Sequence, residues 1–133
     1  MTLNEKIDVW ARSYLWLIPK ERIKQAEFSL SNAACHFNAV SAFRAGRADS
    51  VWLVWAGGEK GVVHFINSKD GKFFDETWHD WEDQSYRVIR KIHPHEHDDV
   101  YEILCDVKRD MVRNYGTLWQ RIRMLPNNLH GVI

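Results

Sequence analysis

Residues 51–78 decide the fold and read VWLVWAGGEKGVVHFINSKDGKFFDETW. They contain three runs of strand length that are rich in β-branched and aromatic side chains: 51–56, 60–66 and 72–78. Asp70-Gly71, between the second and third runs, is a strong signal for a two-residue hairpin turn. These residues therefore predict an antiparallel meander of three strands.

Helical patterns precede this meander. Apolar side chains recur at helical spacing over residues 3–16, and Pro19 suits the first turn of a second short helix that ends near Phe28. A further helix is predicted to begin at a cap formed by Ser31 or Asn32 and to end at Gly46. That helix carries Cys35 in its first turn.

Residues 85–92 suit a fourth strand, and helices are predicted from about Asp98 to Gly116 and over 118–125. The order of helices, then strands, then helices implies an α+β fold, because a parallel sheet requires strands and helices to alternate. We therefore expect a single domain over residues 1–133. It has N-terminal helices, a central antiparallel sheet of three or four strands, and C-terminal helices.

The composition limits the class of protein. The chain has 133 residues, 45% of them hydrophobic and 27% charged, as in a globular domain. Eighteen basic and eighteen acidic residues cancel, which gives no electrostatic reason to expect binding to nucleic acid. The sequence has neither an apolar run of about 18 residues nor a signal-peptide pattern. We expect a cytoplasmic protein that binds no membrane, and near-zero net charge is compatible with a homodimer.

Cysteine 35 is the candidate nucleophile. A thiol attacks as its thiolate, and the unpaired N–H groups at a helix start favour negative charge. His64, in the middle of a strand, is the candidate base, and Asp75 follows it across the predicted hairpin. A two-residue turn sets His64 opposite Thr77 and diagonal to Asp75, whereas a tighter register sets it opposite Asp75. Both put the two side chains on one face of the sheet.

Other residues complete this prediction. The first-turn N–H groups of the helix could hold an oxyanion, with Asn32 as a second donor, and Trp55 and Trp78 are candidate groove walls. Structural roles remain open for the same residues. Cys35 could be a small core residue, and Asp75 could cap a turn or pair with a nearby base, Lys72 or Arg87. Cys105 is expected to be core filler, and both thiols to be free in a reducing cytoplasm.

Three short segments resemble the core motifs of the transglutaminase-like division of the papain-fold cysteine enzymes. They are NAACH with Cys35, VVHF with His64, and DET with Asp75. In that group a cysteine opens a helix, a histidine lies on the next strand, and an Asp-x-Thr segment closes the hairpin. The resemblance spans residues 31–78 and implies a papain-like core in a small, phage-type member. It assigns Cys35 as nucleophile, His64 as base and Asp75 as the residue that orients the base.

We thus expect a small cysteine hydrolase or acyltransferase, of peptidase, amidase or transglutaminase-like type. It would act on an amide or ester bond of a peptide or protein through the trio and would need no cofactor. The alternative is a non-catalytic protein-interaction module on the same scaffold. A weaker alternative is a metal-binding protein, since alternate histidines at His93, His95 and His97 could ligate a metal together with His79 and Asp80.

Overall fold

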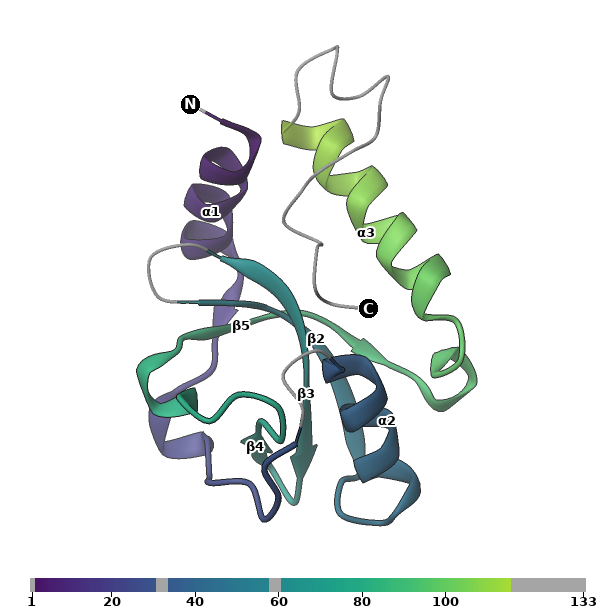
Figure 1. Cartoon of the computed structure of the whole chain (residues 1–133). Helices are drawn as coiled ribbons and strands as arrows, with labels where there is room; N and C mark the ends of the chain where they lie inside the picture. Colours follow the sequence, from purple (N-terminus) through teal and green to yellow (C-terminus); the bar gives the residue numbers. More distant parts are fainter. Residues whose placement is uncertain (1, 31–33, 58–60, 116–133) are drawn as a thin grey trace.

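The computed structural model describes residues 2–30, 34–57 and 61–115 and has an α+β fold, which confirms the predicted class (Figure 1). Five strands form one antiparallel sheet in the order β1-β5-β2-β3-β4. The described elements are α1 (Leu3–Tyr14), β1 (Trp16–Leu17), η1 (Lys20–Arg22), α2 (Cys35–Arg44), β2 (Ser50–Ala56), β3 (Val62–Lys69), β4 (Lys72–Phe74), η2 (Trp81–Asp83), β5 (Tyr86–Ile92), η3 (Pro94–Glu96) and α3 (Val100–Tyr115).

The β3–β4 hairpin has the register of a two-residue turn, with Lys69 opposite Lys72. Asp70 and Gly71 have φ angles of 52° and 79°, the left-handed conformations that such a turn requires. Strand β4 is shorter than predicted and ends at Phe74 instead of residue 78. The reason is that the Asp75 carboxylate accepts hydrogen bonds from backbone N–H groups two and three residues further on and so turns the chain.

The predicted helix from Pro19 to Phe28 is wrong. Only Lys20–Arg22 form a single 3₁₀ turn, after which Ile23 bridges Phe73 and the Lys24 amide donates to the Phe73 carbonyl at 2.8 Å. This segment therefore satisfies its backbone groups at the free edge of β4 and not within a helix.

A fifth strand, β1, adds to the three or four strands expected. Helix α1 ends at Tyr14 and is followed by Leu15, whose backbone is extended. Trp16 and Leu17 then pair with Val88 and Arg87 of β5. A two-residue strand has no alternation from which it could be recognised in the sequence.

The other predicted boundaries agree to within a few residues. Helix α2 begins at Cys35 with Ala34 as its N-cap, whereas the predicted caps Ser31 and Asn32 lie outside the described residues. The predicted strand at 85–92 is β5, and the predicted helix from about Asp98 is α3. The predicted helix at 118–125 also lies outside the described residues. No helix in the described part of the chain is long and apolar enough to span a bilayer.

The three helices pack on one face of the sheet. Their buried side chains form one cluster with inward-facing residues of β2, β3 and β5, for example Leu53 and Phe65. A second cluster lies on the opposite face, where segments beside β1 and β4 cover Val54, Ile66 and Tyr86. The sheet is thus buried on both faces, and side chains that alternate along β3 enter two different cores.

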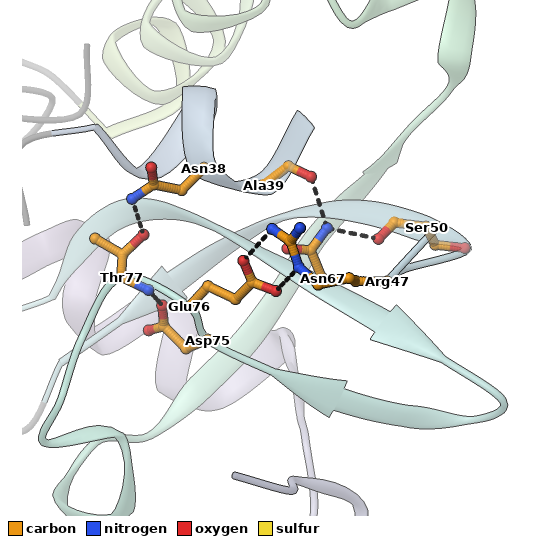
Figure 2. A network of polar contacts seen from close by, with 8 residues as sticks. All are labelled: Asn38, Ala39, Arg47, Ser50, Asn67, Asp75, Glu76 and Thr77. Atoms are coloured by element: carbon orange, nitrogen blue, oxygen red, sulfur yellow. Dashed lines mark hydrogen bonds and ion pairs between the residues drawn. The ribbon is translucent and has the colours of Figure 1, made fainter. Parts of the chain in front are cut away.

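A buried amide fixes α2 to the sheet. Asn67 of β3 is 1% exposed, and its side-chain N–H groups donate to the carbonyl oxygens of Ala39 in α2, at 2.8 Å, and Ser50 in β2, at 3.2 Å (Figure 2). A buried donor that loses its acceptor is costly, so this contact resists sliding of α2 over the strands.

We expect Gly61→Ala to destabilise the protein strongly. A Cβ atom at Gly61 would lie 1.9 Å from Nε1 of Trp55, whose indole is buried and donates to Asp8 Oδ1 at 3.1 Å. Overpacking of this kind lowers the free energy of unfolding by about 2–3 kcal/mol. Gly71→Ala is the control, because a Cβ there meets open space and costs only about 1 kcal/mol of left-handed strain. Denaturant unfolding measures both variants, and equal losses would contradict the prediction.

Candidate active site

Helix α2 places Cys35 at its first residue. Its thiol is not part of a disulfide, and Cys35 is 2% exposed. Its side chain hydrogen-bonds the imidazole of His64, which is likewise 2% exposed. The amino end of α2 thus brings a sulfur atom to a histidine 29 positions later, as the sequence predicts.

His64 lies in the interior of β3, opposite Val54 of β2. Its Nε2 is 2.9 Å from Oδ2 of Asp75, which leaves Nδ1 as the ring nitrogen available to the sulfur. The indole of Trp78 stacks on the imidazole, with ring centroids 3.9 Å apart and planes inclined by 16°. The ring is therefore held by a carboxylate at one nitrogen and an aromatic face on its side.

The carboxylate of Asp75 is saturated with donors. Oδ1 accepts the backbone N–H groups of Thr77 at 2.9 Å and Trp78 at 3.1 Å, and Figure 2 shows the first of these contacts. Oδ2 accepts from His64 and from the hydroxyl of Tyr86 at 2.7 Å. Asp75 thus both caps its own turn and orients His64. The alternative basic partners contact carbonyl oxygens instead: Lys72 that of Glu21 and Arg87 that of Leu15.

Charge is stabilised at this site despite its burial. Burial alone lowers the pKa of His64, but hydrogen bonds and charge interactions with Asp75 and Cys35 outweigh it and raise the pKa to about 9. Burial raises the pKa of the Asp75 carboxyl, yet its contacts with His64, Tyr86 and Thr77 bring it below the ordinary value. Both shifts favour the charged forms, an imidazolium at His64 and a carboxylate at Asp75.

Tyr86 is the residue of this site that sequence reasoning missed. It lies at the start of β5, is buried, and donates to the same oxygen that receives His64. Burial and the neighbouring Asp75 raise the pKa of its hydroxyl, so Tyr86 remains a neutral donor. Its contact depends on the pairing of β5 with β2, and nothing in the local sequence indicates it.

Of the two predicted groove walls, only Trp78 lies at the candidate site. Trp78 lies beside His64, half-buried, and lines a surface cavity of about 420 Å³ with His79, Asp80 and Gln84. Trp55 is buried in the core on the helix side of the sheet and lines no groove. Asn32 lies outside the described residues.

The histidines proposed as a metal site do not converge. His93 and His95 are exposed with parallel rings 5.9 Å apart, whereas His97 is buried with its ring 4.7 Å from Phe43. Over residues 2–30, 34–57 and 61–115, no group of three or more His, Cys, Asp or Glu side chains is placed to hold a metal ion.

Comparison with known proteins identifies no relative of this chain. No protein-family model matches the chain, and no curated protein or solved structure matches it significantly. Any functional conclusion therefore depends on the residues themselves.

The stability of the protein should depend on pH through His64 and Asp75. A pKa raised from 6.5 to about 9 means that the His64 contribution is complete below pH 6.5 and is lost as the pH rises through about 9. A lowered pKa means that the Asp75 contribution is present above its ordinary value of 3.8 and is lost as the pH falls. We expect the free energy of unfolding to fall below pH 3.8, as Asp75 takes up a proton, and to fall towards pH 9, as His64 loses one. Denaturation across pH should show that His64→Gln removes the alkaline fall, and an unchanged alkaline fall would refute the assignment.

Tyr86→Phe should lower the free energy of unfolding by about 1–3 kcal/mol, because a buried carboxylate loses a donor. The same change should move the pKa of Asp75 towards its ordinary value, so the acid loss of stability begins at higher pH. Tyr14→Phe is the matched control, since Tyr14 is exposed. Thermal unfolding at several pH values measures both effects, and the prediction fails if the two variants behave alike.

Proposed function

We propose that this protein is a small cysteine hydrolase or acyltransferase whose nucleophile is Cys35. The observation that carries the proposal is the unbroken series of contacts from the Cys35 sulfur through His64 to Asp75, which also raises the pKa of His64. A thiolate paired with an imidazolium is the reactive form of a cysteine nucleophile.

In the reaction the Cys35 sulfur forms a bond to the carbonyl carbon of an amide or ester. The carbonyl electrons move onto oxygen, and the N–H groups at the start of α2 are the donors for that oxyanion. As the oxyanion collapses, the bond to the amine or alcohol breaks and His64 donates its proton to the leaving group. Water or a second amine, deprotonated by His64, then attacks the thioester. The carbon–sulfur bond breaks, and the sulfur departs beside a His64 that again carries a proton, as at the start.

The substrate that fits this proposal is a peptide or protein. Trp78 stacks on His64 and also lines the cavity of about 420 Å³, so an extended chain bound there would contact the indole that covers the base. The net charge of zero favours no polyanionic substrate. The reducing conditions of the cytoplasm, the location we propose, keep the thiol from forming a disulfide.

A second candidate function is a non-catalytic protein-interaction module. Two observations favour it. Cys35, His64 and Asp75 are each 3% exposed or less, so in this conformation the sulfur is closed to a large substrate. A larger cavity of about 610 Å³ lies between α1, β5 and α3, where Trp10, Ile89 and Met111 give apolar surface to a partner.

Alkylation separates these two functions. We expect iodoacetamide at neutral pH to modify buried Cys35 faster than half-buried Cys105, because the Cys35 side chain contacts the imidazole of His64. The His64→Ala variant should lose this preference. Peptide mass spectrometry measures the two rates in the same molecule, so Cys105 serves as an internal reference. If Cys35 is modified slowly, and at the same rate in the wild type and in His64→Ala, the interaction module is favoured.

A further inference from the structure

Two polar contacts join α2 to the turn that carries Asp75 (Figure 2). Near the amino end of the helix, Asn38 donates through Nδ2 to the hydroxyl oxygen of Thr77 at 3.1 Å. Just after the carboxyl end, Arg47 donates to both carboxylate oxygens of Glu76, at 2.8 and 3.0 Å. The chain is therefore attached to the consecutive residues 76 and 77 at two places, one in the first half of α2 and one just after the helix ends.

The first contact completes a ring around the candidate active site. Asn38 lies one helical turn after Cys35, and its partner Thr77 donates its backbone N–H to Asp75 at 2.9 Å. Asp75 holds His64, and His64 contacts Cys35. A shift of α2 relative to the turn breaks a contact in this ring, because every member is fixed to the next.

The second contact, between Arg47 and Glu76, opposes a rotation of α2 that would pivot on the first contact, between Asn38 and Thr77. The Glu76 side chain is 1% exposed and is paired in the two-bond geometry that fixes direction as well as distance. A buried carboxylate that loses its cation is strongly destabilised, so the contact persists as α2 fluctuates. The guanidinium of Arg47 also lies over the ring of Phe28, 4.6 Å from its centroid, which restricts its own motion.

We propose that Asn38 and Arg47 are positioning residues that hold the Cys35 sulfur against His64. Neither touches the reacting atoms, and both act by locking α2 to the Asp75–Thr77 turn. The inference rests on the proposed function, since it concerns the geometry of the same nucleophile and base. Displacement of a reacting group by about 1 Å reduces rates by up to about a hundredfold, so small movements of α2 would be measurable.

The test compares the alkylation rate of Cys35 with that of Cys105 across pH. We expect Asn38→Leu and Thr77→Val each to reduce the ratio of the two rates by about tenfold. The double variant should fall no further than either single one, because both remove the same contact. Thr77→Ser keeps the hydroxyl and should restore the wild-type ratio. Arg47→Met should also reduce the ratio, and Arg47→Lys, which retains the charge but not the paired bonds, should reduce it less.

Two controls separate positioning from stability. Ile7→Val removes one methylene from the core on α1 and lowers stability without changing any contact between Cys35, His64, Asp75, Thr77 and Asn38. The ratio of the Cys35 rate to the Cys105 rate should therefore equal that of the wild type. Titration of the His64 ring by NMR gives a second readout that does not depend on access of the reagent. In Asn38→Leu we expect the pKa of His64 to move from about 9 towards its ordinary value as the sulfur moves away.

The outcomes are distinct. If Asn38→Leu and Arg47→Met keep the wild-type ratio and the wild-type His64 titration while they unfold more easily, the two residues are only structural and the inference is overturned. If wild-type Cys35 shows no preference that depends on His64, the proposed function itself fails and the positioning role fails with it. If Arg47→Met does not fold, the Arg47→Lys and Thr77→Val results decide the question.

Discussion

The carboxylate of Asp75 is the interaction on which this structure depends. It receives two backbone N–H groups, a tyrosine hydroxyl and an imidazole, and so joins the end of β4 to β3 and β5. Without these donors a charged group would be buried at a cost of several kcal/mol, on the order of the stability of a small domain. The same four contacts therefore end a strand, connect three strands across the sheet, and hold an imidazolium in the interior.

The polar groups of the interior are arranged as a network around α2. Asn67 holds Ala39 of the helix to β3, whereas Asn38 within the helix and Arg47 in the segment after it contact the turn after β4. Each of these three side chains has an acceptor, and the buried carboxylates of Asp75 and Glu76 have several donors or a cation, which is what a low-dielectric interior requires. Within the described residues, the buried Nε2 atoms of His36 and His97 are the exceptions, because neither has a hydrogen-bond partner. Such a network specifies one arrangement of helix and sheet, because sliding by a fraction of a turn leaves several groups unsatisfied at once.

The sequence predicts those parts that depend on local patterns. Asp70-Gly71 indicates the hairpin and its register, and the apolar periodicity indicates β2, β3, β5, α1 and α3. Cys35, His64 and Asp75 are found in the sequence because a helix start and a hairpin relate them. Tyr86 and the contacts of α2 are not found, because each depends on residues brought together only by the completed sheet. The helix predicted at Pro19 fails for the same reason: the edge of β4 outcompetes a weak local preference.

The two-residue turn at Asp70 and Gly71 makes this hairpin intolerant of length changes. Side chains alternate across a strand, so an added residue that shifted the pairing of β4 with β3 by one position would exchange the inward and outward side chains of β4 and of the turn after it. Asp75 would then point into the opposite core, away from the imidazole it now accompanies. The length of this turn therefore determines whether Asp75 meets His64 and Tyr86, although the turn itself contacts neither of them.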